Sequence, residues 1–278
     1  MRLTTNFSST EKLGFKTATT DLESIYNDTQ ANVIIIATRH NLHAKQTIQA
    51  LQAGKHTFIE KPLVTTLEEL NQVKEVWQRL AKRPCLMVGF NRRFAPHILQ
   101  AKKLLTPISS PKHIIMTVNA GFIPASHWTQ ATEVGGGRLI GEACHFVDLL
   151  RFLIGYPIKL AKAFAIDKQD DQVTINLEFS DGSVGVIHYL ANGNKAFPKE
   201  RLEIFTAGKI IVVDNFRKMK AYGFKNFKKL NLWRQDKGQA NCVKAFLEGL
   251  KAGQSPIEFD ELVEVHQVCI DLYNQIKS

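Results

Sequence analysis

The sequence lacks the features that mark secreted, membrane-spanning and disulfide-rich proteins. Its four cysteines have neither metal-site nor disulfide spacing (Cys85, Cys144, Cys242 and Cys269). No apolar run reaches membrane-spanning length, and the N-terminal residues have no signal-peptide core. These absences favour a cytoplasmic protein with reduced thiols and no membrane contact. With 278 residues, the chain is long enough for two domains.

Acidic residues are missing between Asp214 and Asp236, in a chain of net charge +10. Basic and aromatic residues alternate there (Arg217, Lys218, Lys220, Lys225, Lys228, Lys229 and Arg234; Phe216, Tyr222, Phe224, Phe227 and Trp233). We favour a solvated loop or a sheet edge protected by lysines. Attraction of an anionic small substrate is a second interpretation. Single-stranded nucleic acid comes last, because no recognition motif accompanies the segment.

The first third of the chain has the pattern of a parallel sheet covered by helices. The β-branched run at residues 33–38 is typical of a strand buried on both faces. Helices are predicted over residues 42–53, ended by Gly54, and from the capping box of Thr66 and Glu69 to about residue 81. Strands at residues 56–59 and 85–90 complete an α/β, Rossmann-like unit.

The rest of the chain has a different pattern of predicted elements, in which strands dominate. Helices are predicted at residues 96–105, 139–153, 239–250 and 261–276. Strands are predicted at residues 114–120, 158–166, 173–179, 184–190, 202–205 and 210–213. Asp181-Gly182 is a hairpin signal between two of these strands. The sequence therefore predicts an α+β domain with a large, mostly antiparallel open sheet.

Polar residues follow two neighbouring strands of the predicted parallel sheet. Glu60-Lys61-Pro62 closes the strand at residues 56–59, and residues 38–41 follow the preceding strand. The carboxyl ends of parallel strands meet at one edge, where such sheets bind ligands. A charged pair at a buried strand end is costly unless it faces a pocket. We weigh a ligand-facing Lys61 about equally against a surface lysine beside a turn.

A second cluster is expected on the helix at residues 139–153. Glu142, His145 and Asp148 are spaced by three and would lie near one helix face. They could bind a metal, make ordinary hydrogen bonds, or support His145 as an acid or base. Three glycines, residues 135–137, precede this helix and favour close backbone approach to a ligand. The spacing does not choose among these interpretations.

Several motifs together resemble the Gfo/Idh/MocA oxidoreductase family. They are Glu60-Lys61-Pro62, the run at residues 89–94, and the glycines at residues 135–137 with His145 and Asp148. The resemblance runs from about residue 14 to the C-terminus. The phrases at residues 127–128, 141–145 and 197–201 are similar to the branch found fused to zinc-type alcohol dehydrogenase domains.

The resemblance implies a two-domain NAD(P)-dependent oxidoreductase acting on a sugar, nucleotide sugar or polyol. Residues 1–91 would form a partial Rossmann domain, and residues 92–278 a substrate domain whose sheet builds homo-oligomers. Lys61 and His145 match the catalytic residues. The residues expected to border the cofactor are Thr38, Arg39, His43, Glu60, Lys61 and Pro62. Those expected to contact substrate are Arg92, Glu142 and Asp148.

Two departures from the family pattern modify this expectation. Many members carry an aspartate four residues before the histidine, where this chain has Gly141, and Glu142 points about 100° away on a regular helix. The first strand, glycine loop, helix and second strand are also expected to be absent, because only Gly14 precedes Gly54. NAD or NADP binding would then be weakened or lost. Two rivals are a non-catalytic binding or assembly module and a metal-dependent enzyme.

Overall fold

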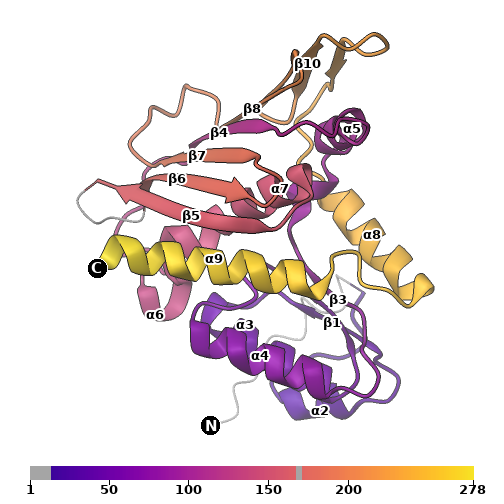
Figure 1. The fold of residues 1–278 in the computed structure, drawn as a ribbon. Helices are drawn as coiled ribbons and strands as arrows, with labels where there is room; N and C mark the ends of the chain where they lie inside the picture. The colour runs from indigo at the N-terminus through magenta and orange to yellow at the C-terminus, as the bar shows by residue number, and fades with distance from the viewer. Residues whose placement is uncertain (1–13, 167–170) are drawn as a thin grey trace.

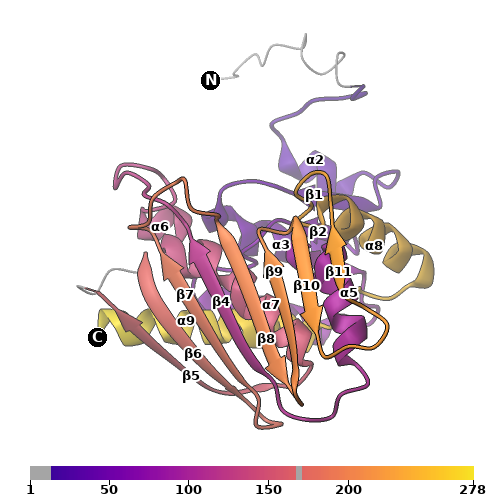
Figure 2. The same ribbon diagram turned by 90° about the horizontal axis from the view of Figure 1, so that it is seen from above.

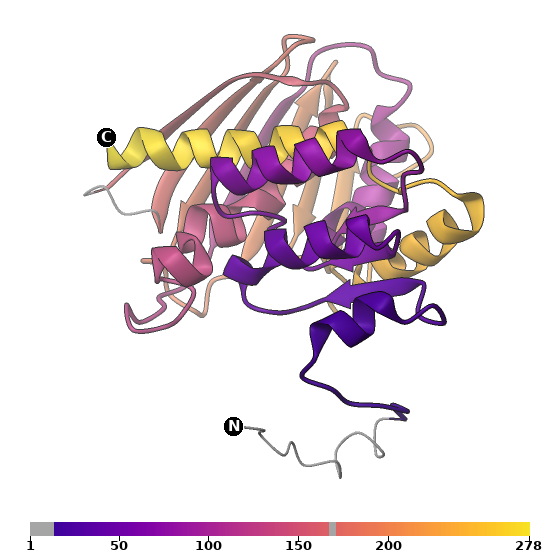
Figure 3. The ribbon, with the colours of Figure 1, turned by 90° about the horizontal axis from the view of Figure 1, so that it is seen from below.

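The structure, a computed structural model, describes residues 14–166 and 171–278. Its N-terminal part contains a three-stranded parallel sheet in the order β1-β2-β3. The elements are α2 (Leu22–Asn27), β1 (Val33–Ile36), α3 (His43–Gln52), β2 (His56–Ile59), α4 (Leu67–Arg79) and β3 (Leu86–Val88). Helices α3 and α4 lie side by side over this sheet (Figure 3). Among the described residues β1 pairs only with β2, and Ile35 on it is 69 % exposed.

The larger sheet has eight strands in the order β11-β10-β9-β8-β4-β7-β6-β5. Strands β4 and β7 pair in parallel, and all other neighbours are antiparallel (Figure 2). The strands are β4 (His113–Asn119), β5 (Ile158–Ala165), β6 (Gln172–Phe179), β7 (Val184–Leu190), β8 (Glu200–Thr206), β9 (Lys209–Asp214), β10 (Lys218–Tyr222) and β11 (Lys229–Asn231). Alternate residues along these strands are buried, as expected when helices cover one face.

Helices join the two sheets into one body with a continuous apolar core. Helix α9 (Phe259–Lys277) lies between the large sheet and α4, and α7 (Cys144–Ile154) packs against it (Figure 1). The remaining helices are α5 (Pro96–Leu105), α6 (Thr132–Gly135) and α8 (Gln239–Ala252). Leu150 of α7 packs so closely on β7 that a Cβ at Gly185 would lie 2.6 Å from it. No helix of the described residues lies over the opposite face of the large sheet (Figure 2).

The fold class predicted from the sequence is confirmed, with one correction. The helix expected at residues 139–153 begins with a π-helical turn (Leu139–Ala143), and α7 starts only at Cys144. This turn moves Glu142 away from the helix face that carries His145 and Asp148. The basic and aromatic segment forms β10 and β11, so the sheet-edge interpretation is correct. None of the helices in the described ranges combines the length and apolar character needed to cross a bilayer.

Candidate active site

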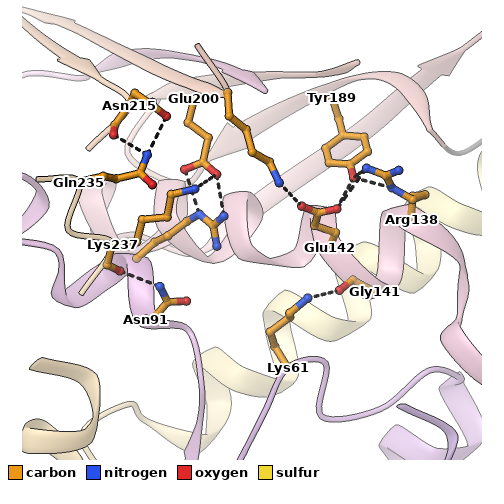
Figure 4. Close-up of polar contacts among 12 residues, drawn as sticks. Lys61, Asn91, Arg138, Gly141, Glu142, Tyr189, Glu200, Asn215, Gln235 and Lys237 are labelled. Atoms are coloured by element: carbon orange, nitrogen blue, oxygen red, sulfur yellow. Dashed lines mark hydrogen bonds and ion pairs between the residues drawn. The ribbon is translucent and has the colours of Figure 1, made fainter. Parts of the chain in front are cut away.

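Lys61 follows β2 directly and faces residues that come from the π-helical turn. Its Nζ donates a hydrogen bond of 2.7 Å to the carbonyl oxygen of Gly141 (Figure 4). The side chain lines a cavity of about 170 Å³ together with His40, Trp128, Arg138 and Glu142. The sequence interpretation of Lys61 as a residue facing a cavity therefore holds.

The buried imidazole of His43 connects the segments that follow β1 and β2. Its Nδ1 lies 2.6 Å from the carbonyl oxygen of Pro62, and its Nε2 lies 3.1 Å from that of Thr38. Because both ring nitrogens are engaged, His43 holds the backbone on each side of the site. Pro62 is itself buried. The ring therefore positions Lys61 and Thr38, and in this arrangement it has no free nitrogen for a ligand.

Glu142 is the centre of a second polar cluster beside Lys61 (Figure 4). Its Oε2 accepts hydrogen bonds from the Tyr189 hydroxyl (2.6 Å) and from Arg138 Nη2 (3.2 Å). Its Oε1 accepts one from Lys199 Nζ at 2.9 Å. Burial alone would raise the pKa of Glu142, but the Lys199 charge and the Tyr189 hydrogen bond lower it to about 2. Glu142 is therefore a carboxylate at every physiological pH.

Tyr189 lies fully inside the protein, where its phenol is shared by Glu142 and Arg138. Arg138 Nε donates to the phenolic oxygen at 2.7 Å, and the guanidinium also lies over the ring. Burial, followed by the charge of Glu142, raises the pKa of Tyr189. The phenol therefore stays protonated and acts as a hydrogen-bond donor to the carboxylate.

His145 occupies the first turn of α7, and only 5 % of it is exposed. Its Nδ1 is buried without a hydrogen-bond partner among the described residues. Burial lowers its pKa well below the usual value, and the charges of Arg92 and Lys61 lower it further. His145 is thus a neutral imidazole near pH 7. The charge of Lys61 thus acts on His145, although the imidazole is not among the residues that line the cavity of Lys61.

Arg92 is held by a carboxylate that lies 108 positions away in the chain. Its guanidinium donates to both oxygens of Glu200, at 2.7 and 3.3 Å, and Lys237 Nζ donates to the same carboxylate at 2.9 Å. Glu200 is only 1 % exposed, so both of its oxygens are satisfied inside the protein (Figure 4). The Arg92 guanidinium also lies over Phe146, 4.8 Å from the ring centre.

Asp148 is placed differently from the substrate contact predicted for it. Its carboxylate is 0 % exposed and accepts from Arg93 Nε at 2.8 Å. Glu261 of α9 binds the same guanidinium through Nη1 at 2.7 Å. Arg93 therefore connects α7 to α9 in the interior, and Asp148 lies outside the cavity. This geometry argues against a substrate contact by Asp148.

The three residues weighed as metal ligands do not converge. Glu142 is bound by Tyr189 and Lys199, whereas Asp148 is bound by Arg93. Within residues 14–166 and 171–278, no group of three or more histidine, cysteine, aspartate and glutamate side chains could hold a metal ion. The π-helical turn explains the difference, because a spacing of three gives a common face only on a regular helix.

The edge formed by the ends of β1 and β2 is open along one side. Thr38 and Arg39 are exposed, and the Thr38 hydroxyl donates to Gln46 Oε1 at 2.7 Å. The Arg39 guanidinium lies 6.0 Å from the centre of the Trp128 indole ring. Glu60 is also exposed, and its carboxylate lies over Gly89, where a Cβ would come within 3.1 Å of it. This edge offers polar side chains and backbone to a ligand.

Sequence reasoning assigned no role to several residues of these clusters: Arg138, Tyr189, Lys199, Glu200 and Lys237. It did place His40, within residues 38–41, at this edge. Burial lowers the pKa of His40 to about 4, and its Nδ1 lies 2.8 Å from the carbonyl oxygen of Gly135. A usable signal existed for Tyr189, because it is in phase with Gly185 and Ile187 on the inward side of β7. No local pattern indicates that Lys199 and Glu200 have partners far away in the sequence.

Two family descriptions match this chain. Residues 4–90 match the oxidoreductase family with an NAD-binding Rossmann fold. Residues 100–211 match the GFO/IDH/MocA C-terminal domain. The two matches follow each other along the chain in the order of the two sheets.

Relatives and solved structures agree with these matches. Levoglucosan dehydrogenase of Pseudarthrobacter phenanthrenivorans is 28 % identical over 66 % of this chain and 55 % of its own length. The matched part thus spans little more than half of that relative. Myo-inositol 2-dehydrogenase of Thermotoga maritima is 23 % identical over 88 % of this chain and 77 % of its own.

Among solved structures, an NAD binding oxidoreductase from Klebsiella pneumoniae superposes with a TM-score of 0.83 at 22 % identity, covering 97 % of this chain and 84 % of that one. Levoglucosan dehydrogenase in complex with NADH superposes with a TM-score of 0.79 at 21 % identity, covering 97 % of this chain and 85 % of that one. At these identities the likeness concerns the fold.

Proposed function

This chain belongs to the Gfo/Idh/MocA family of NAD-binding oxidoreductases, and we propose that it transfers a hydride between a nicotinamide dinucleotide and a sugar or polyol. One observation carries the proposal. Lys61 faces a cavity of about 170 Å³ at the carboxyl end of β2, together with His40, Arg138 and Glu142. Relatives named for levoglucosan and myo-inositol support a polyhydroxylated substrate.

Lys61 and His145 have different roles at the reacting oxygen: Lys61 donates a hydrogen bond to it, and His145 accepts its proton. The Lys61 ammonium now donates to the Gly141 carbonyl at 2.7 Å and can donate in the same way to a substrate oxygen in the cavity. That hydrogen bond stabilises negative charge as a hydroxyl becomes a carbonyl. His145 is neutral, so it can accept the hydroxyl proton in the oxidation direction. Glu142 remains charged and holds Lys199, Arg138 and Tyr189 around the cavity.

The open edge fits the nicotinamide half of a dinucleotide. Thr38, Arg39 and Glu60 are exposed there, while His43 fixes the backbone beneath them. A bound dinucleotide supplies the acceptor or donor of the hydride. The described residues before β1 contain only one glycine, Gly14, and so offer no glycine-rich loop for the pyrophosphate. We propose that these residues alone bind NAD or NADP weakly.

A binding titration followed by turnover tests this function. We expect NADH fluorescence to change on titration with the protein, and NAD reduction in the presence of a sugar or polyol from a panel. Lys61→Met and His145→Gln should each lower kcat by about 10²–10⁴-fold, the usual contribution of acid–base groups. The control Lys45→Met changes an exposed lysine on α3 and should retain the activity.

The two assays separate the proposed enzyme from its rival. Absence of NADH binding at about 1 mM, an affinity of only about 4 kcal/mol, would reject the enzyme for this chain and favour a binding or assembly module. Binding with full turnover in Lys61→Met would retain the oxidoreductase and reject the assigned catalytic residue.

We further propose a homo-oligomer formed through the uncovered face of the large sheet.

A further inference from the structure

A second, larger cavity lies directly beside the one that contains Lys61. It measures about 660 Å³ and is lined by Asn119, Gly121, Phe122, Lys195, Phe197 and Lys199. Two contacts cross the partition between the cavities. Lys199 Nζ donates to Glu142 Oε1 at 2.9 Å, and Arg138 Nη1 donates to the Gly121 carbonyl at 3.2 Å. Glu142 and Arg138 line the small cavity, while Lys199 and Gly121 line the large one.

The lining of the larger cavity combines positive charge with aromatic surface. Lys195 and Lys199 are its charged residues, and no acidic side chain lines it within the described ranges. Phe122 is 72 % exposed and Phe197 is 57 % exposed. A single exposed phenylalanine needs no explanation, but two at one cavity with two ammonium groups form a surface for an anionic aromatic ligand. Nucleobases stack on such rings, and lysines bind phosphate.

The charge around the small cavity also favours an anionic ligand. Four cationic side chains form ion pairs with the carboxylates of Glu142 and Glu200 (Arg92, Arg138, Lys199 and Lys237). Lys61 is a fifth cation, and it donates to the Gly141 carbonyl. Four of these cations lower the pKa of His145, after burial. A neutral polyol needs no such excess of positive charge. An anionic substrate would be attracted by it and would balance it once bound.

We propose that the substrate is a sugar joined to a nucleoside diphosphate, which deepens the proposed function and rests on it. The sugar occupies the small cavity, where its reacting oxygen meets Lys61. The diphosphate lies across the partition and is bound by Lys199 and Lys195. The nucleobase occupies the larger cavity against Phe122 and Phe197. The Lys199–Glu142 ion pair then marks the passage between sugar and phosphate.

Calorimetric titration without cofactor tests this assignment independently of hydride transfer. The probes are ADP, GDP, UDP and CDP, with inorganic pyrophosphate and the neutral nucleosides as the separate halves. At least one nucleoside diphosphate should bind about tenfold or more tightly than pyrophosphate and than its own nucleoside, since both halves of the site contribute. Lys195→Ala and Phe197→Ala should each weaken that binding about tenfold.

A lysine outside the cavity provides the matched control. Lys251→Ala removes an exposed lysine from the last turn of α8 and should leave the affinity unchanged. Equal loss in Lys251→Ala and Lys195→Ala would overturn the site in favour of general charge attraction. Pyrophosphate binding as tight as that of the nucleoside diphosphates would overturn the aromatic subsite, and no binding by any probe would overturn the proposal.

Failure of this inference is distinguishable from failure of the proposed function. Oxidation of free sugars by a chain that binds no nucleoside diphosphate would refute the substrate class and leave the oxidoreductase standing. Binding of a nucleoside diphosphate, weakened by Lys195→Ala, in a chain that binds no NADH would support the site and refute the oxidoreductase.

Discussion

Gly141 and Glu142 are neighbours in the π-helical turn, but only position 142 has space for a side chain. A Cβ at Gly141 would lie 2.9 Å from the carbonyl oxygen of Gly135 and 3.2 Å from His40 Cε1. No side chain fits there unless the backbone shifts, so the aspartate expected from the family pattern has no space. Glu142 has space, and it binds Tyr189 and Lys199. The carboxylate near Lys61 therefore comes from a neighbouring position.

The ionised state of Glu142 predicts a specific pH dependence of stability. Its pKa is about 2 in the folded protein against an ordinary value of 4.5. A lowered carboxylate pKa stabilises the fold fully above about pH 4.5 and loses this effect as the pH falls toward 2. Glu142→Gln should lower the free energy of unfolding by up to about 3 kcal/mol at pH 7, and by progressively less below pH 4.5. Urea unfolding at a series of pH values measures this difference.

A partly exposed glutamate on β6 of the large sheet is the matched control. Glu178 pairs with Lys159 at 3.0 Å, but its side chain is 42 % exposed. Glu178→Gln should change the free energy of unfolding by less than about 1 kcal/mol, as is usual for surface pairs. A Glu142→Gln effect that is equally small, or constant from pH 7 to 3, would contradict the assigned pKa.

At the scale of elements, local sequence signals determine where helix α4 begins. Thr66 caps it as predicted: its hydroxyl accepts from Glu69 N at 3.2 Å, and Glu69 Oε2 accepts from Thr66 N at 3.2 Å. Thr66→Ala should lower the free energy of unfolding by about 1 kcal/mol, because it removes a partner of a helix N-terminal amide. Thr66→Ser keeps the hydroxyl and should remain within a few tenths of the wild type. Equal loss in both variants, measured by thermal unfolding, would rule out the cap as the cause.

Signals of this local kind explain which parts of the fold were predictable. Strand β2 and helix α5 have the predicted bounds, and Gly155 ends α7 in the left-handed conformation expected of a cap. The π-helical turn has no comparable signal, because one extra residue in a turn leaves the apolar pattern almost unchanged. For this reason Glu142 was expected on the face of His145.

At the scale of the whole molecule, the sequence did not predict the contacts between site residues that lie far apart in the chain. Lys61 could be predicted because a strand end in a parallel sheet has a known relation to ligands. The partners of Arg92 and Arg93 could not, because Glu200 and Glu261 are brought to them only by the packing of β8 and α9. Arg92 was expected to contact substrate, whereas its guanidinium is occupied by a buried carboxylate. Tertiary packing thus decides which charged residues remain available to a ligand.

The uncovered face of the large sheet gives the last prediction, which concerns assembly. Adjacent strands place Asn176, Val186, Ile115 and Glu203 in one row across this face. All four side chains are half-buried, and no helix of the described chain lies over them (Figure 2). A broad mixed face of this kind suits a self-complementary interface between two copies. Each protomer then contributes the same row.

Val186→Glu should convert the proposed oligomer into a monomer. A two-fold interface brings both copies of a central residue close together, so the substitution buries two unpaired carboxylates. Val243→Glu, on the exposed side of α8, is the matched control and should keep the wild-type mass. Sedimentation velocity at micromolar concentration distinguishes the two. A wild-type protein that is already monomeric would rule out the oligomer. A Val186→Glu variant that keeps the oligomeric mass would place the interface elsewhere, because an interface at this face would have to bury the two introduced carboxylates.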